Sequence, residues 1–122
     1  MIGLGIDAVD IGRFRTVLAR RPAMAERLFS EGERAYVAAM VDPAPSLAAR
    51  FAAKEAVMKA LGVGLGAFRF TDVEVVRLAS GQPALHVHGA AAALASKQGV
   101  GKWLVSLTHT SSVAQAVVAA LP

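Results

Sequence analysis

One long helical pattern in the middle of the chain constrains the fold more than any other feature. Residues 46–61 carry apolar side chains at the roughly 100° spacing of an α-helix, and these form one stripe: Leu47, Phe51, Met58 and Leu61. Ser46 is suited to cap the first turn and Gly62 to end the last one. Pro43 and Pro45 predict a loop before the helix, because proline disfavours a helical conformation in the residue that precedes it. We therefore expect a helix from Ser46 whose apolar side is covered by other elements.

The segments before this helix predict one strand and several shorter helices. The opening segment IGLGIDAV is apolar and strand-like, and the residues after it change to helical periodicity. Pro22 should begin a further short helical piece. Ser30 and Glu33 have the spacing of a capping box, which predicts a helix that continues to about Met40.

The segments after the long helix are mainly strand-like. Residues 71–79 and 83–88 alternate in the strand manner around a turn, so they predict a hairpin. An alanine-rich helix is expected at 89–99, followed by two strands at 102–110 and 111–121. Helices in the first half and strands in the second predict an α+β fold, with an antiparallel sheet packed against helices.

Size and composition narrow the possible functions. The 122 residues, 55% of them hydrophobic, predict a single domain spanning 1–122. No apolar run approaches the roughly 20 residues of a membrane-spanning helix, so we expect a soluble cytoplasmic protein with no membrane contact. The absence of cysteine excludes disulfides, thiolate zinc sites and cysteine nucleophiles. Catalysis would have to use carboxylates, histidine, lysine or a hard metal ion.

The charge balance favours an anionic partner. The formal net charge is +4, with 13 Lys and Arg against 9 Asp and Glu. Such a surface attracts phosphates or an acidic protein. The aromatic residues have core-like spacings and do not alternate with the cations, so a nucleic-acid stacking surface is not expected.

Charged residues interrupt the apolar stripe of the long helix. Lys54 points into the middle of the stripe, Glu55 lies at its edge, and Lys59 follows one turn later. A cation in a buried stripe usually meets a partner or a ligand. Alternatively, Lys54 extends to solvent along its aliphatic stem while Glu55 and Lys59 form a surface ion pair. The spacing alone leaves both interpretations open.

Asp7 is an acid at the end of an otherwise apolar strand. It can cap the helix that follows, a role it would share with Asp10. It can also hold magnesium together with a carboxylate from a helix, since Mg²⁺ takes one or two protein acids and fills its other positions with water or phosphate oxygens. Both roles remain possible from the residues alone.

Glycines and histidines give weaker signals. Gly62, Gly64 and Gly66 follow the basic helix end, and they fit either a flexible connector or a loop beside a ligand. His109 on the last predicted hairpin can be a base, a phosphate donor or a structural residue. His86 and His88 share one strand face without further ligands nearby, so no metal site is expected there.

Three segments, taken in order, resemble a known family. GIDAVDIGRF, RFAAKEAVMKALG and VSLTHTSSVAQAVV are similar to the motifs of the holo-acyl-carrier-protein synthases, and the similarity extends from about Gly3 to Ala119. The resemblance implies a single-lobed, magnesium-dependent phosphopantetheinyl transferase. Such an enzyme moves 4′-phosphopantetheine from coenzyme A to a serine of an acidic acyl carrier protein, in fatty-acid or polyketide synthesis, and releases adenosine 3′,5′-bisphosphate.

The resemblance also implies roles for individual residues. Asp7 and Glu55 correspond to the magnesium ligands, and Lys59 to the cation on the coenzyme A phosphates. Arg50 and Lys54 would assist Lys59 from the same helix. These positions make Asp7, Glu55 and Lys59 the expected catalytic residues.

Further positions correspond to binding surfaces. The resemblance places four residues along the nucleotide cleft: Gly62, Pro83, His109 and Thr110. Three arginines correspond to the surface that docks the carrier protein: Arg13, Arg20 and Arg21. Small members of the family are trimers with each active site between subunits, so a homotrimer is expected.

Two points stay open at this level. The larger two-lobed transferases carry an acid where this chain has Val9, so magnesium would have fewer protein ligands here. The base could be a magnesium-bound water or Glu55. A basic binding module without catalysis is the main competing interpretation, and a trimer that has lost activity is another.

Overall fold

The computed structural model describes residues 1–122 and contains five α-helices, five strands and one 3₁₀-helix. Their order is β1 (Gly3–Asp10), α1 (Ile11–Arg20), α2 (Met24–Leu28), α3 (Glu31–Val37), α4 (Ala44–Leu61), η1 (Phe70–Asp72), β2 (Val73–Arg77), β3 (Pro83–Val87), α5 (Gly89–Lys97), β4 (Lys102–His109) and β5 (Val113–Leu121). Helices dominate the first half and strands the second, so the predicted α+β class is confirmed. None of the helices is both long and apolar enough to cross a bilayer.

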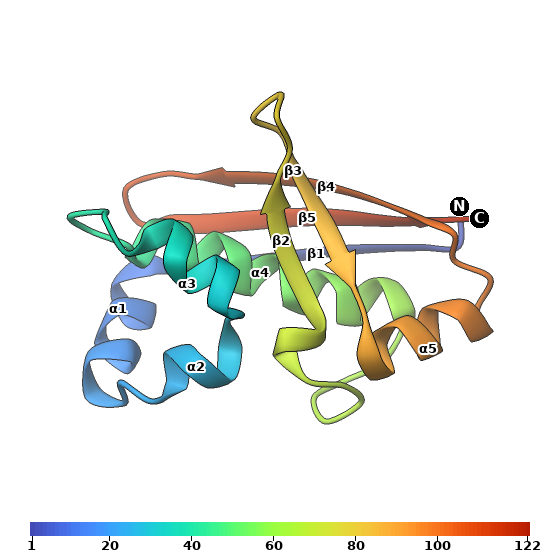
Figure 1. Cartoon of the computed structure of the whole chain (residues 1–122), viewed down its shortest axis with the longest axis horizontal. Coiled ribbons are helices and arrows are strands. Elements are labelled where there is room, and N and C mark those ends of the chain that lie inside the picture. The colour runs from blue at the N-terminus through green and yellow to red at the C-terminus, as the bar shows by residue number, and fades with distance from the viewer.

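The strands form two antiparallel sheets. In the larger one β5 lies between β1 and β4, and the smaller one is the β2–β3 hairpin. Figure 1 shows the three long strands side by side, with the hairpin crossing in front and both termini at the same end. The single sheet expected from the sequence is therefore divided in two, while the predicted hairpins are present.

Helix α4 lies against the larger sheet at very short distance. A Cβ added to Gly3 would lie 1.9 Å from the Ala60 carbonyl oxygen, and one added to Gly5 would lie 1.8 Å from that of Ala56. Glycine at these two positions of β1 thus permits a backbone approach that any larger residue there would prevent. Because other elements cover most of its remaining surface, α4 is the centre of the core.

The start of α4 differs from the prediction. The helix begins at Ala44 with Pro43 as its N-cap residue, so the prediction of a Ser46 N-cap is wrong. Pro45 lies in the first turn, where the missing N–H has no helical partner in any case. The predicted end is confirmed, because Gly62 adopts a left-handed conformation with φ of 70°.

The capping box that opens α3 is present as predicted. Ser30 Oγ accepts a hydrogen bond from the Glu33 N–H, and the Glu33 carboxylate accepts one from the Ser30 N–H. Helix α3 ends at Val37, about one turn before the predicted Met40.

One face of the larger sheet carries apolar side chains in the open. On the side opposite α4, the exposed residues include Leu4, Ile6, Leu104 and Val117. The strand register confirms that they share a face, since Ile6 pairs with Val117 and Ala119 pairs with both Leu4 and Leu104. The three-stranded sheet is therefore covered on one side only within this chain.

Candidate active site

The exposed edge of α4 carries the reactive side chains. Most of the helix is buried, but Phe51 and Glu55 are half-buried and Lys59 is exposed. These positions recur every four residues, so they form one narrow strip along the helix. The strip borders β1, which packs against α4 along its length.

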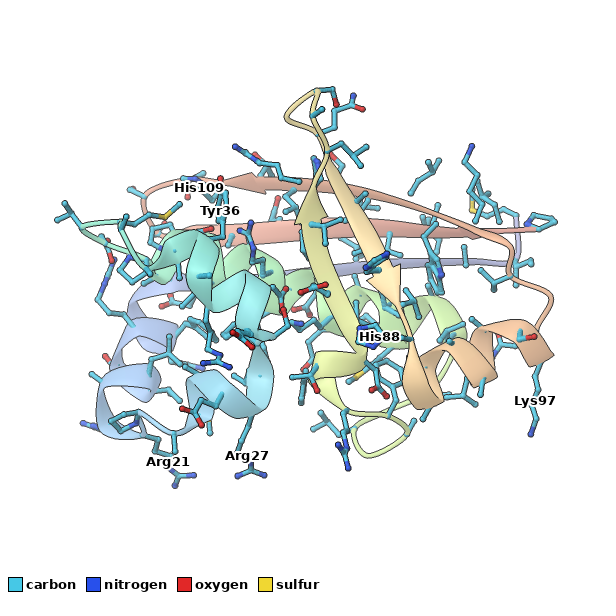
Figure 2. All side chains as sticks on the ribbon, in the orientation of Figure 1. Arg21, Arg27, Tyr36, His88, Lys97 and His109 are labelled. Carbon is cyan, nitrogen blue, oxygen red and sulfur yellow. The ribbon has the colours of Figure 1, made fainter.

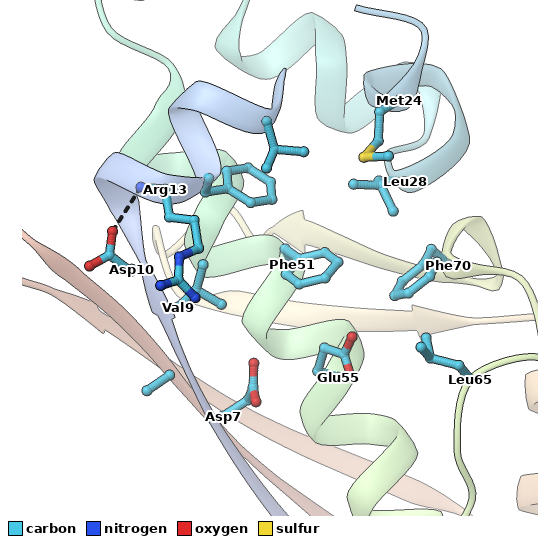
Figure 3. A pocket seen from close by; sticks show the side chains of 13 residues that line it. Asp7, Val9, Asp10, Arg13, Met24, Leu28, Phe51, Glu55, Leu65 and Phe70 are labelled. Atoms are coloured by element: carbon cyan, nitrogen blue, oxygen red, sulfur yellow. Dashed lines mark hydrogen bonds between the residues drawn. The ribbon is translucent and has the colours of Figure 1, made fainter. Parts of the chain in front are cut away.

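Asp7 faces this strip from β1. It alternates with exposed Ile6 and Ala8, so its side chain lies on the side of the sheet that α4 covers, with 18% of it exposed. Figure 3 shows the carboxylates of Asp7 and Glu55 directed into the same cleft. Capping of α1 falls to Asp10, whose Oδ1 accepts a 2.7 Å hydrogen bond from the Arg13 N–H. The capping role considered for Asp7 is therefore wrong.

Lys59 binds β1 rather than its neighbour on the helix. Its Nζ donates to the Ile6 carbonyl at 2.8 Å and to Asp7 Oδ1 at 3.1 Å. The surface ion pair between Glu55 and Lys59 that the spacing allowed is not among the salt bridges of the structure. Asp7, Glu55 and Lys59 thus form one cluster that joins β1 to α4.

The environment of Glu55 stabilises its protonated form. Burial raises the pKa of the Glu55 carboxyl, and the negative charge of Asp7 raises it further, while the Lys59 ammonium opposes both effects. Two neighbouring carboxylates also attract a cation to the space they share. No other histidine or acidic side chain lies close enough to serve as a third ligand. A hard ion held here would therefore need water or substrate oxygens as well.

The acids lie at one end of an apolar cleft of about 640 Å³. Its apolar lining comes from β1, α1, α2, α4, the loop after α4 and η1, and consists of Ala8, Val9, Phe14, Val17, Met24, Leu28, Phe51, Leu65 and Phe70. Arg13 lines the same cleft. The sequence did not reveal this apolar lining, because its members fit equally well as core residues.

Lys54 does not reach the cleft. It is completely buried, and its Nζ donates to Glu33 Oε1 at 2.8 Å, to the Phe70 carbonyl at 3.0 Å and to the Val73 carbonyl. An ammonium group has three N–H donors, so none is left for a phosphate. The prediction that Lys54 assists in coenzyme A binding is wrong, as is the alternative that it extends to solvent. It is a structural cation that joins α4 to α3, η1 and β2.

Arg50 and His109 lie in a second pocket. This pocket has a volume of about 440 Å³ and also contains Tyr36, Asp42 and Arg77. Arg50 is offset from Phe51 and Glu55 around the helix, so the second pocket and the cleft lie on different sides of α4. The predicted coenzyme A residues Arg50 and His109 are therefore separated from the Asp7 and Glu55 cleft within one chain.

The remaining predicted residues are not in the cleft either. Thr110 lies in the turn between β4 and β5, where its Oγ1 accepts from the N–H groups of Ser112 and Val113. Pro83 begins β3 and lines a groove beside Trp103. Three residues at helix ends are exposed: Arg20, Arg21 and Gly62.

Comparison with known proteins supports the family resemblance. A sequence model of the 4′-phosphopantetheinyl transferase superfamily matches residues 3–119. The chain belongs to this superfamily. The holo-[acyl-carrier-protein] synthase of Streptomyces avermitilis is 51% identical to the transferase over 127 residues, covering 98% of this chain and 97% of that protein.

Solved structures agree with the transferase fold. The holo-[acyl-carrier-protein] synthase of Neisseria meningitidis matches it with a TM-score of 0.91 at 29% identity, covering 100% of this chain and 99% of the other. A synthase from Bacillus anthracis, solved in complex with CoA (3′,5′-ADP), matches with a TM-score of 0.80 at 30% identity, covering 96% and 93%. The predictions of a phosphopantetheinyl transferase enzyme and of its fold are confirmed.

Proposed function

We propose that this transferase moves 4′-phosphopantetheine from coenzyme A to a serine of an acyl carrier protein in a magnesium-dependent reaction. The observation that carries the proposal is the pair of carboxylates, Asp7 from β1 and Glu55 from α4, that face one cleft beside Lys59. The related Bacillus anthracis synthase, solved in complex with CoA (3′,5′-ADP), supports the choice of donor. Residues 1–122 would act as a single catalytic domain.

The cleft residues fit a magnesium ion. Asp7 and Glu55 supply only oxygen ligands, which Mg²⁺ prefers, and they leave positions for water and phosphate oxygens. Burial raises the pKa of Glu55 most and the negative charge of Asp7 raises it further, and a cation held by the two carboxylates would favour the ionised form of Glu55. When bound, Mg²⁺ would neutralise charge on the diphosphate of coenzyme A.

The reaction needs alignment and charge neutralisation more than covalent help. The carrier serine oxygen attacks the β-phosphorus and loses its proton, while the bond to the α-phosphate oxygen breaks and adenosine 3′,5′-bisphosphate leaves. Lys59, already beside Asp7, would contact the phosphates with its ammonium group. The serine proton would pass to a water or to Glu55, and the water is the preferred base because a carboxylate that holds a cation is a weak base.

The proposed active unit is a homotrimer with active sites between subunits. Two observations support it: the cleft with Asp7 and Glu55 is separate from the pocket with Arg50 and His109, and one sheet face exposes apolar residues. One subunit would offer the cleft with Asp7 and Glu55, and its neighbour would offer Arg50 and His109. An apolar sheet face of this kind is typical of a surface that another chain covers.

The carrier protein would dock on α1. Arg13 lines the cleft, and Arg20 and Arg21 lie exposed at the end of the same helix. Carrier proteins of this family are acidic, so these cations would attract them and orient the serine toward the cleft.

The direct test is transfer itself. Apo carrier protein, coenzyme A and Mg²⁺ are incubated with the enzyme, and mass spectrometry detects the added phosphopantetheine. Lys59→Ala should raise the KM for coenzyme A about tenfold or more, as expected when a charged phosphate contact is lost. Lys97→Ala removes an exposed cation of α5 and serves as the matched control. Absence of product from folded enzyme with several carriers would refute the proposal.

A further inference from the structure

Lys59 contacts one of the two carboxylates to which magnesium binding is assigned. From the last turn of α4 its Nζ reaches β1, where it lies 3.1 Å from Asp7 Oδ1 and 2.8 Å from the Ile6 carbonyl oxygen. The Asp7 side chain is only 18% exposed, whereas that of Lys59 is 53% exposed. A lysine side chain has a flexible four-carbon stem, so the ammonium group is the partner of this pair that can move away.

The charges of the cluster favour such a movement when a dication binds. When both acids are ionised, Asp7 and Glu55 carry two negative charges and Lys59 one positive charge, so the cluster retains an excess of one negative charge. A dication held by the two carboxylates would reverse that sign, and the Lys59 ammonium would then lie beside a positive charge. Lys59 and a dication therefore compete for the Asp7 carboxylate.

The contacts of Lys59 also limit what it can offer to a phosphate. An ammonium group has three N–H donors, and Lys59 directs two of them to Ile6 and Asp7. Its positive charge is already partly neutralised by the Asp7 carboxylate. Leaving Asp7 would free both a donor and the charge for a phosphate oxygen.

We propose that Lys59 is a displaceable counter-ion of the metal site: it holds Asp7 until a divalent ion binds there, and it then turns to the phosphates of coenzyme A. The inference rests on the proposed function, because it takes Asp7 and Glu55 as the metal ligands and coenzyme A as the donor. Lys59 would then have opposite effects on the two ligands. It would weaken metal binding by the free enzyme while it strengthens the binding of coenzyme A.

Divalent-ion binding without coenzyme A tests this opposition. Mn²⁺ is the probe, because it takes the same oxygen ligands as Mg²⁺ and its unbound form is measured by electron paramagnetic resonance. Lys59→Met keeps an aliphatic side chain and removes the charge, so Mn²⁺ should bind about threefold to tenfold more tightly than to the wild type, as expected when one partly exposed competing charge is lost. Lys59→Arg retains a cation and should bind Mn²⁺ nearly as weakly as the wild type.

Two control variants separate direct competition from a general loss of positive charge. Arg13→Ala removes another cation of the same cleft, one that is in none of the salt bridges. Lys97→Ala removes an exposed cation from the end of α5 (Figure 2). Both should leave the Mn²⁺ affinity close to that of the wild type. Circular dichroism verifies that each variant is folded.

Thermal unfolding of the same proteins gives a second readout. Without a divalent ion, Lys59→Met should unfold at a lower temperature than the wild type, because the contacts with Asp7 and Ile6 are lost. Saturating Mn²⁺ should reduce this difference, since Lys59 would then have left Asp7 in the wild type as well. A difference that stays the same or grows with Mn²⁺ would contradict the displacement.

The outcomes distinguish this inference from the proposed function. Unchanged or weaker Mn²⁺ binding in Lys59→Met would overturn the inference, as would an equal gain in Arg13→Ala. Normal transfer by the wild type with no gain in Lys59→Met would refute the competition alone. Tighter binding in Lys59→Met without any transfer by the wild type would refute the proposed function and support the competition. No Mn²⁺ binding by any variant would overturn both the competition and the assigned metal ligands.

Discussion

Replacing Lys54 with methionine should severely destabilise the fold while leaving the cleft chemistry intact in the molecules that remain folded. Lys54 and Glu33 are both fully shielded from solvent, and their charged atoms lie 2.8 Å apart. Burial lowers the pKa of Lys54, and the attraction of the Glu33 carboxylate for the Lys54 ammonium opposes this shift most strongly. Lys54→Met would leave that carboxylate charged, buried and without its cation.

The expected cost follows from this geometry. Removing one partner of a buried ion pair costs about 3–5 kcal/mol, and the carbonyls of Phe70 and Val73 also lose a donor. Since domains of this size have about 5–15 kcal/mol of stability in total, the loss is a large fraction. Adding Glu33→Gln removes the stranded charge, so the double variant should be at least about 1 kcal/mol more stable than Lys54→Met.

Urea unfolding at one fixed protein concentration and pH 7 measures these differences, with coenzyme A KM values determined on the folded enzyme. The reasoning is refuted if Lys54→Met loses less than about 1 kcal/mol, or if the two substitutions are additive. A raised KM for coenzyme A in folded Lys54→Met would instead restore the phosphate-binding role that the structure contradicts.

Three more predictions address packing, electrostatics and docking. Gly5→Ala places a Cβ 1.8 Å from a carbonyl oxygen of α4 and should lower the free energy of unfolding by about 3 kcal/mol or more in thermal unfolding. Gly64→Ala is the control, because a Cβ there has nothing within 4 Å, and it should change the stability little. Equal effects of the two substitutions would contradict the close packing. Asp7→Asn removes a charge that raises the pKa of Glu55, so an NMR pH titration should find the Glu55 pKa lower than in the wild type; an unchanged or higher pKa would oppose the pairing. Arg13→Glu should raise the KM for the carrier protein and spare that for coenzyme A, and equal damage to both would argue against docking on α1.

Much of the fold could be predicted because local chemistry determines it. Periodicity located α4 and the later strands, and the αL glycine Gly62 ended the helix as expected. The start of α4 was placed too late, because a proline in the first turn is as compatible with a helix as with a loop. Sequence spacing cannot distinguish a helix from a loop here, because the choice depends on which residues pack over this turn.

The site was predictable only where the sequence carried a specific motif. Helical spacing placed Lys54 correctly on a buried face of the helix. Its partner Glu33 lies 21 residues upstream, and the capping box with Ser30 already explained the presence of an acid at that position, so nothing in the sequence indicated the ion pair. Tyr36 and Arg77 come from elements that meet only in three dimensions. No periodicity signals that kind of convergence.

Magnesium binding measured by calorimetry, with coenzyme A present, tests the central claim most directly. Wild-type enzyme should bind Mg²⁺ and transfer phosphopantetheine, because the carboxylates of Asp7 and Glu55 lie in one cleft. Asp7→Ala and Glu55→Ala should remain folded yet lose most of both the metal affinity and the turnover. Variants that bind Mg²⁺ and turn over like the wild type would contradict the account.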